Sequence, residues 1–185
     1  MNDEMYKIIT VPDPVLKQTA QEVSKVDDDL RAQFDKMYAT MRQAPGIGLA
    51  ANQVGLLNRV FVMHVDTNRE DEDDFKDTGP VFLANPEIIW KSEETSVLEE
   101  GCLSIPGQYA EVERPAKVRV KYLDYEGAEK EMEGSGLIAH VIQHELDHLN
   151  GVLFTDYLSR LKRNMMIKRV RKLVKSGGGD DSSTL

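Results

Sequence analysis

The sequence predicts an α+β fold, and three observations support this fold class. Segments with strand-like patterns fill the middle of the chain and segments with helical patterns flank them, an arrangement typical of α+β proteins. The length of 185 residues suits one domain and is sufficient to bury a core without disulfide bonds. The sequence also shows no internal repeat and no linker that would divide it into two domains.

The first long helix is predicted between residues 28 and 44. It follows residues 11–22, where prolines and a polar stretch predict a turn and then a single turn of helix. After the aspartates at 27–29, apolar residues recur at spacings of three and four, as on one helix face: Leu30, Phe34, Met37, Tyr38 and Met41. The aspartates suit the positive end of the helix dipole, and Pro45 ends the helix by Ala44.

The middle of the chain predicts a loop and then several strands. Residues 46–55 are mostly small, and we interpret them as a loop. Strands are expected at 59–65, 81–84, 87–90, 117–123 and 129–133, with the clearest apolar and charged alternation at 117–123. The acidic stretch at 66–79 is expected to be a solvated loop.

The C-terminal part predicts two helices. Residues 136–149 place apolar residues on one side, and Gly151 follows as a C-terminal stop: Leu137, Ile138, Val141, Ile142, Leu146 and Leu149. A last helix is expected at about 157–174. The final residues, 176–185, are mainly Gly, Ser and Asp and are expected to be disordered.

Composition indicates a cytoplasmic protein with no membrane segment. Cys102 is the only cysteine, so no internal disulfide can form and nothing indicates an oxidising compartment. The N-terminus carries early acids and no long apolar run, unlike a secretory signal. No stretch approaches the roughly 18 uninterrupted apolar residues of a membrane span.

The segment Gln143-His144-Glu145-Leu146-Asp147-His148 carries the strongest chemical signal. Two histidines at i and i+4 lie on one helix face and can hold one metal ion. Glu145 lies about 100° round the helix from His144, from where it can reach a metal-bound water without being a ligand. The alternative is a polar surface helix, but the apolar residues just upstream indicate a core helix, where polar groups need a partner.

A catalytic site of this kind usually has a third protein ligand. His140 is excluded, because it lies about 12 Å along the helix from His148, whereas ligands of one metal lie within roughly 4 Å of each other. His140 is expected to line the site or, more often for such a residue, to lie on the helix surface, and His64 is expected to be structural. Cys102 taken alone would be a buried small hydrophobic residue, but beside two histidines it becomes the favoured third ligand.

Three segments of the chain resemble the signature motifs of the peptide deformylase family. They are Gly46-Ile47-Gly48-Leu49-Ala50-Ala51-Asn52-Gln53, Glu100-Gly101-Cys102-Leu103-Ser104 and Gln143-His144-Glu145-Leu146-Asp147-His148-Leu149-Asn150-Gly151. Their order and spacing also fit, and the likeness extends from about residue 5 to 170. It implies antiparallel β-sheets packed around a central metal-binding helix, an additional C-terminal helix, and a single catalytic domain at 1–175 followed by the tail 176–185.

The resemblance also implies a role for each matching residue. Cys102, His144 and His148 would hold the metal, and Glu145 would be the general acid and base. Gln53 and the backbone N–H of Leu103 would stabilise the oxyanion, although taken alone Gln53 reads as a loop residue that caps backbone groups. The substrate would contact the backbones of Ile47 and Gly48 as an added strand, and its methionine pocket would be lined by Leu98, Leu137, His140 and Val141. His140 departs from the apolar residue common in relatives at that position.

The implied reaction is the removal of the N-formyl group from the formyl-methionine of nascent polypeptides. A divalent metal lowers the pKa of its bound water, Glu145 accepts the proton and passes it to the leaving amine, and uncharged donors stabilise the growing negative charge. A cysteine with two histidines suits several metals. The resemblance implies Fe²⁺ in the cell, with Zn²⁺, Ni²⁺ or Co²⁺ in isolated protein.

The charge distribution indicates a further partner. The net charge is −9, yet residues 160–175 carry eight basic residues and no acidic one. A solvated helix face explains this equally well, but a basic helix also suits contact with ribosomal RNA near the emerging nascent chain. No exposed heptad or apolar repeat is apparent, so we expect a monomer.

Two other functions remain open at the level of the sequence. A metallopeptidase of another specificity would share the His-Glu-x-x-His segment but would not need Cys102 or Gln53. A metal-bound protein that docks on ribosomes without catalysis would not need Glu145.

Overall fold

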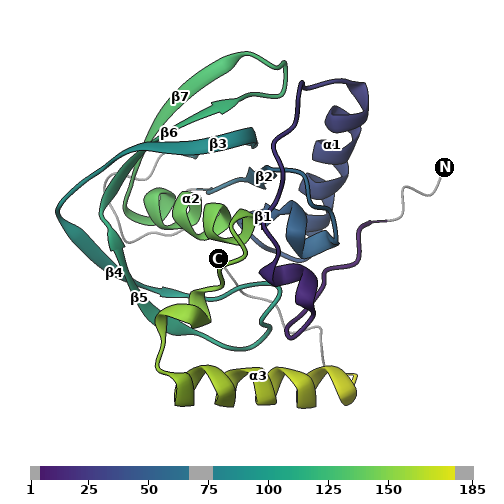
Figure 1. Ribbon diagram of the computed structural model, residues 1–185, viewed down its shortest axis with the longest axis vertical. Helices are drawn as coiled ribbons and strands as arrows, with labels where there is room; N and C mark the ends of the chain where they lie inside the picture. The colour runs from purple at the N-terminus through teal and green to yellow at the C-terminus, as the bar shows by residue number, and fades with distance from the viewer. Residues whose placement is uncertain (1–4, 67–76, 178–185) are drawn as a thin grey trace.

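The computed structural model describes residues 5–66 and 77–177. Its centre is helix α2 (Gly136–Leu149), and antiparallel strands surround this helix on several sides (Figure 1). A five-stranded sheet and a two-stranded sheet are present in this part of the chain. The α+β class and the antiparallel sheets around a central helix are therefore confirmed.

The larger sheet has the strand order β1-β2-β3-β6-β7, and every neighbouring pair in it is antiparallel. Its strands are β1 (Gly48–Ala50), β2 (Val60–Met63), β3 (Val81–Lys91), β6 (Lys117–Leu123) and β7 (Glu129–Ser135). β4 (Thr95–Glu100) and β5 (Ala110–Pro115) form the smaller sheet. The nine residues between β4 and β5 form the loop that carries Cys102.

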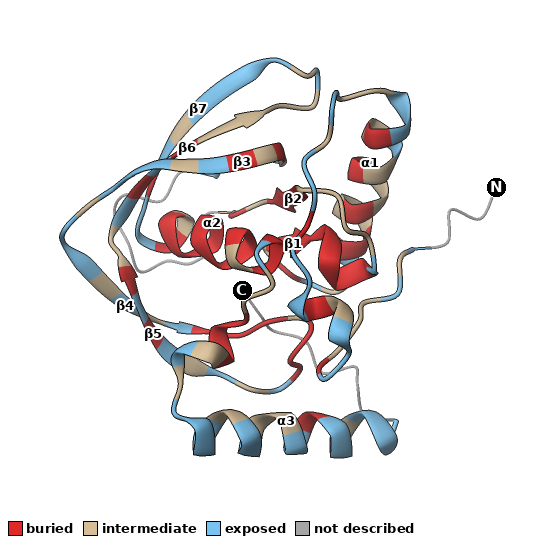
Figure 2. Cartoon of the chain, in the orientation of Figure 1, coloured by how far each residue is buried: buried red, intermediate tan, exposed pale blue. Residues whose placement is uncertain are grey.

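The other helices cover the outside of this arrangement. α1 (Asp28–Gln43) contacts β1 and β2, and the side chain of Asp27 accepts the Leu30 N–H at its start. α3 (Arg160–Lys175) lies along one side of the molecule and buries Val170 (Figure 2). Within 5–66 and 77–177, three short 3₁₀ helices complete the order: η1 (Pro14–Lys17), η2 (Ala51–Val54) and η3 (Phe154–Tyr157).

Helix α2 is buried along almost its whole length, as the red colour in Figure 2 shows. Its apolar residues form one core cluster with strands of the larger sheet, including Phe61, Leu83 and Val120. A helix so enclosed presents its polar side chains to the interior of the protein. Any histidine or glutamate on it must then find a partner inside.

Most predicted elements are confirmed, and several boundaries differ for clear reasons. The strand at 117–123 and the helix at 136–149 coincide with β6 and α2. The strands expected at 81–84 and 87–90 are one strand, β3, with register shifts on either side of Ile88. Asn85 adopts a positive φ of 50° there, and its side-chain amide exchanges hydrogen bonds with the Val23 backbone.

Three expectations about local structure were wrong. The segment 46–55 is not only a loop, because it contains strand β1 and helix η2. Strands β4 and β5 were missed, since the glutamates in both segments resemble a solvated stretch until the two strands pair. The last helix begins at Arg160 and not at 157, because the side chain of Ser159 accepts the Lys162 N–H and forms the helix cap.

Most of the acidic loop at 66–79 and of the tail at 176–185 lies outside the described residues.

Candidate active site

Helix α2 brings the His-Glu-x-x-His side chains into the interior. His144, Glu145 and His148 are each no more than 2% exposed. The ring Nε2 atoms of His144 and His148 lie 3.2 Å apart, so both rings present the same nitrogen to one point. The predicted spacing of one helical turn is therefore realised as a shared binding point.

Cys102 completes a three-residue cluster. Its Sγ lies 3.2 Å from His148 Nε2, and the ligand atoms of Cys102, His144 and His148 all lie within 4.8 Å of one another. One thiol and two imidazoles form the donor set of a catalytic transition-metal site that keeps a position open. The side chains of Cys102, His144 and His148 therefore fit a divalent metal. Among residues 5–66 and 77–177, they form a group that could hold such an ion.

The structure corrects the expected position of His140. Its side chain is 0% exposed, whereas the helix surface was the favoured location. The ring contacts Ser96 and Glu100, so it belongs to a buried polar network and not to the three-residue cluster. His64 lies just after β2, where Tyr38 and Asp77 contact its two ring nitrogens.

Glu100 is the centre of that network, and sequence reasoning gave it no role. Arg114 donates from Nε to one carboxylate oxygen at 2.6 Å and from its terminal nitrogen to the other at 2.9 Å. The Nδ1 atoms of His140 and His144 each lie 3.0 Å from one of the same two oxygens. Glu100 therefore orients the ring of His144, which is the usual work of a carboxylate behind a metal-binding histidine.

The signal that could have identified Glu100 is its place in the sequence. It lies two residues before Cys102 at the end of a strand, and it is 0% exposed. A buried glutamate needs a cationic partner. The pairing of β4 with β5 brings Arg114 of β5 close to Glu100 of β4, and the two side chains form an ion pair. The hydrogen bonds from Arg114, His140 and His144 outweigh burial and hold the pKa of Glu100 far below its usual range.

Glu145 lies in the opposite kind of environment. Burial raises its pKa to about 7, with the charge of Glu100 adding in the same direction and that of His144 opposing it. Its Oε2 has no hydrogen-bond partner among the described residues. This oxygen is therefore available to a water or a substrate atom, as a general base requires.

Strand β1 packs directly against Glu145. A Cβ atom built on Gly48 would lie 2.3 Å from Glu145 Oε1, so only glycine permits the observed position of the carboxylate. Gly46 approaches the side chain of Leu103 in a similar way. The segment 46–48 is thus packed between the Glu145 carboxylate and the Cys102 loop.

Gln53 points its amide at the cluster. Its Oε1 accepts the Ala50 N–H at 2.9 Å, which fixes the amide so that Nε2 lies 3.4 Å from Cys102 Sγ and 3.1 Å from Ser104 Oγ. Gln53 is buried, and Leu103 follows Cys102 directly in the loop. The structure therefore brings the Gln53 amide to Cys102, and Leu103 is the next residue of the same loop.

His144 and His148 differ in their electrostatics. Burial, together with the charges of His144 and Arg114, lowers the pKa of His148 well below its usual value. Burial also disfavours a charge on His144, but hydrogen bonds to Cys102 and Glu100 outweigh it and raise the pKa. His144 therefore holds a proton more readily than His148 does.

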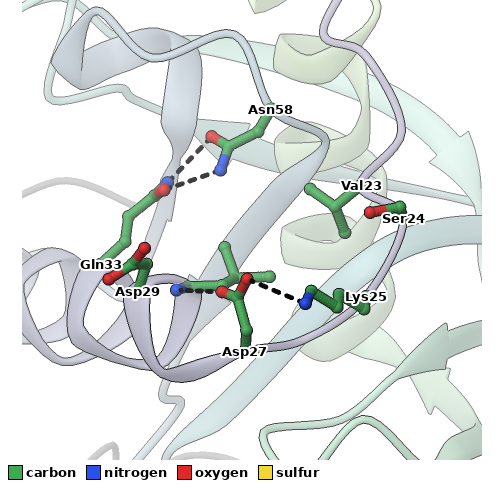
Figure 3. Close-up of a pocket in the computed structure, with 8 residues that line it drawn as sticks. Val23, Ser24, Lys25, Asp27, Asp29, Gln33 and Asn58 are labelled. Atoms are coloured by element: carbon green, nitrogen blue, oxygen red, sulfur yellow. Dashed lines mark hydrogen bonds and ion pairs between the residues drawn. The ribbon is translucent and has the colours of Figure 1, made fainter.

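A separate hollow of about 320 Å³ lies at the start of α1 (Figure 3). Gln33 and Asn58 exchange two amide hydrogen bonds across it, and Asp27 caps the helix. None of the predicted site residues lines this hollow, which is formed by Val23, Ser24, Lys25, Asp27, Asp29, Leu30, Gln33 and Asn58. It is not a competing active site.

Comparison with known proteins agrees with this geometry. A model of the family described as polypeptide deformylase matches residues 5–164. The chain belongs to that family. A peptide deformylase of Phenylobacterium zucineum is 54% identical over 170 residues, which are 92% of this chain and 97% of the relative. A peptide deformylase of Rhizobium meliloti is 50% identical over 171 residues, 92% and 95% of the two chains.

Solved structures give the same result. The crystal structure of a peptide deformylase from Ehrlichia chaffeensis has a TM-score of 0.90 at 41% identity and covers 94% of this chain and 99% of its own. A second structure from the same organism, in complex with actinonin, has a TM-score of 0.86 at 43% identity, with 91% and 97% covered. The family inferred from the three motifs, and with it a metal-dependent deformylase, is confirmed.

The residues that the deformylase motifs assign to the methionine pocket come together in the structure. Leu137 and Val141 belong to the core cluster of α2, and Leu98 of β4 and Ile47 pack against it. The ring of His140, on the same helix, contacts Ser96 and Glu100. Gly48 lies in β1, the edge strand of the larger sheet, as an added substrate strand requires.

No helix in the described ranges is both long enough and apolar enough to span a membrane.

Proposed function

We propose that this chain removes the N-formyl group from peptides that begin with formyl-methionine, with Glu145 as the residue that transfers the proton. The observation that carries the proposal is the unpartnered Glu145 Oε2 beside the cluster of Cys102, His144 and His148. The donor Nε2 of Gln53 lies on another side of the same cluster. A general base, a metal-binding triad and an uncharged donor around one point suit the hydrolysis of an amide.

Cys102, His144 and His148 would hold the metal. When bound there, a divalent metal supplies Lewis-acid activation of the attacking water and of the carbonyl group. Gln53 and the Leu103 N–H then donate to the carbonyl oxygen as negative charge grows on it. Neutral donors suit this task because they hold the charge without giving up a proton.

Glu145 moves the proton. Its carboxylate accepts a proton from the attacking water and passes it to the amine that leaves, and a pKa near 7 suits both transfers at neutral pH. The close packing of Gly48 against Oε1 leaves Oε2 to exchange the proton. Burial of the carboxylate limits competing contact with bulk water.

The substrate backbone would pair with the edge at Ile47 and Gly48, and its methionine side chain would enter the pocket of Leu98, Leu137, His140 and Val141. Strand addition fixes the peptide direction, and the apolar pocket selects an unbranched side chain. These contacts would place the formyl carbon beside the metal cluster. The shared packing of Ile47 and Leu98 on the α2 core supports this arrangement.

Assays on two substrates test the proposal. We expect hydrolysis of formyl-Met-Ala and no cleavage of an internal peptide bond, since a general metallopeptidase would cleave the latter. The variant Glu145→Gln should lose about 10²- to 10⁴-fold in kcat while it keeps its metal. Equal activity of the variant and the wild type would contradict the role of Glu145, and cleavage of the internal peptide would favour a metallopeptidase.

The metal in the cell is proposed to be Fe²⁺, with Zn²⁺, Ni²⁺ or Co²⁺ in isolated protein. A thiolate and a ferrous ion both invite oxidation, so the iron form should lose activity in air faster than the nickel form. Activity of both forms is measured during exposure to air. Equal lifetimes would contradict the assignment of iron.

We also propose that the chain acts in the cytoplasm as a monomer and that residues 1–175 form one catalytic domain. A further proposal is that the basic helix at 160–175 contacts the ribosome. Leu161 is 72% exposed and Met165 45% exposed on α3, and Val170 holds the helix to the body of the protein. Co-sedimentation with ribosomes should weaken with added salt. If a variant that ends at Leu158 co-sediments as well as the full chain does, the contact is not made by this helix.

A further inference from the structure

His140 is a buried histidine that transfers no proton in the proposed reaction. It lies on α2 one turn before His144, and its side chain is 0% exposed. Both ring nitrogens have partners: Nε2 lies 2.9 Å from Ser96 Oγ, and Nδ1 lies 3.0 Å from Glu100 Oε1. The ring therefore links strand β4 to the carboxylate that orients a metal-binding residue.

The hydrogen bonds fix where the protons lie. Arg114 holds Glu100 as a carboxylate through two hydrogen bonds, so Glu100 can only accept. The Nδ1 atoms of His140 and His144 must then both donate. A proton on Nδ1 of His144 leaves the lone pair of Nε2 free to bind a metal. Nε2 is also the nitrogen that faces His148 and Cys102.

Each carboxylate oxygen of Glu100 accepts one hydrogen bond from Arg114 and one from a histidine. Oε1 accepts from Arg114 Nε and His140, and Oε2 accepts from the terminal nitrogen of Arg114 and His144. Arg114 alone would hold the carboxylate from one side. His140 is the contact that prevents it from turning away from His144, and Ser96 in turn holds the ring of His140.

The other metal-binding histidine shows why this matters. Nδ1 of His148 is buried and has no partner among the described residues, so no hydrogen bond at Nδ1 orients that ring from behind. The Glu100 network therefore provides the hydrogen-bonded restraint on the pair of histidines. Loss of that restraint should loosen the metal more than a loss of packing does.

We propose that Ser96 and His140 are positioning residues, which hold Glu100 in place and through it keep His144 directed at the metal. The inference rests on the proposed metal role of His144. It also gives His140 a task other than lining the methionine pocket. Partners of this kind behind a metal ligand typically change metal affinity by about 10- to 100-fold.

Three substitutions at one position test the idea. His140→Asn keeps an N–H donor near the place of Nδ1, His140→Gln keeps one near the place of Nε2, and His140→Leu keeps neither. Release of zinc from the loaded protein to an excess of chelator is followed by a colorimetric indicator. We expect His140→Leu and His140→Gln to release zinc about tenfold faster than the wild type or more, and His140→Asn to stay within about threefold of it.

Ile142→Val is the matched control, because Ile142 is buried on the same helix and has no place in the network. Thermal unfolding of every variant shows whether it is folded. The visible absorption of the Co²⁺ forms should change for His140→Leu and remain that of the wild type for Ile142→Val, since it reports the ligand geometry directly. Ser96→Ala should change zinc release in the same direction as His140→Leu but by less.

Two results would overturn the inference: equal zinc release by His140→Leu and Ile142→Val, or failure of His140→Asn to restore what His140→Leu loses. Metal release needs no formylated substrate. If the wild type failed to act on formyl-Met-Ala, the proposed function would fail while the comparison of the variants remained decisive for His140.

Discussion

Glu100 and Glu145 are both buried, and their surroundings give them opposite properties. Glu100 receives donors from Arg114 and two histidines, which hold its pKa far below the usual range. Glu145 has an unpartnered oxygen, and burial raises its pKa to about 7. One glutamate therefore stays charged and orients His144, whereas the other can take up and release a proton. Such a separation of pKa values typically marks a structural carboxylate and a catalytic one.

The pH dependence of catalysis follows from Glu145. A general base must be ionised to accept a proton, so kcat/KM should fall as the pH drops below the pKa of Glu145. That pKa is about 7 in the structure, and the charge of a nearby dication lowers it, so the acid limb is expected at or below pH 7. A pH–rate profile of kcat/KM on a formylated peptide measures it. An alkaline shift of the limb, well above pH 7, would contradict the assignment.

Gln53 should matter to the rate more than to the fold. Gln53→Met keeps the length of the side chain but removes the donor at 3.4 Å from Cys102 Sγ. We expect kcat to fall by about 10²- to 10³-fold, the usual cost of one oxyanion donor. Metal content and thermal unfolding serve as controls. A loss confined to KM would instead place Gln53 in substrate binding.

At the scale of elements, the site depends on the contact between strand β1 and helix α2. β1 has only three residues, yet it lies against the Glu145 carboxylate and forms the edge of the larger sheet. The helix supplies the chemistry and the strand fixes where one carboxylate can lie. Gly151 has a comparable task at the end of α2, since a Cβ atom there would lie 2.4 Å from the backbone oxygen of Lys17.

Gly48→Ala tests the contact between β1 and α2. The new methyl group would lie 2.3 Å from Glu145 Oε1, so the carboxylate must move. We expect kcat to fall by about tenfold or more, since small misplacements of a catalytic group are costly, and zinc release to stay close to that of the wild type. Kinetics and metal analysis check this. Unchanged kcat would mean that Glu145 tolerates displacement.

At the scale of the whole molecule, one network centred on the buried pair of Arg114 and Glu100 joins three parts of the fold. Arg114 of β5 bonds Glu100 of β4, Asp147 of α2 and Tyr157 of η3. The smaller sheet, the central helix and the segment that leads to α3 are therefore held together by charged groups. Burial of such a network contributes when every member is satisfied and costs stability when one is removed.

Acid should weaken this network. Because the pKa of Glu100 is lowered on folding, its contribution to the free energy of unfolding is fully present above the unfolded value of 4.5 and is lost as the pH falls below it. At neutral pH, Glu100→Gln should lower the free energy of unfolding by about 3 kcal/mol, because it leaves Arg114 less well paired. Urea unfolding at pH 7 and at pH 4 measures the free energy of unfolding of the wild type and of Glu100→Gln.

The difference between wild type and Glu100→Gln should narrow at the lower pH. A difference that is the same at both values would mean that packing, and not charge, is lost in the variant. His140→Leu can be measured beside it, since it removes a neutral contact of the same carboxylate.

The sequence by itself determined the elements whose pattern is local. The helix at 136–149 and the strand at 117–123 follow from periodicity, and the shared face of His144 and His148 follows from their spacing of one helical turn. The motifs also identified the family, and they singled out Cys102 as the residue to look for beside the two histidines. These features depend on neighbours within a few residues, which is why they are visible without the fold.

Only the tertiary structure decided the surroundings of those residues. The contact of Gly48 with Glu145 and the burial of His140 join segments that are far apart in the sequence. Strands β4 and β5 could not be predicted, because their exposed glutamates give no apolar pattern from which to infer a strand. Their pairing brings Glu100 and Arg114 together. Charge and burial act through space, so a local pattern shows which residues can bind a metal, but the fold decides which carboxylate contacts His144 and which one keeps an unpartnered oxygen.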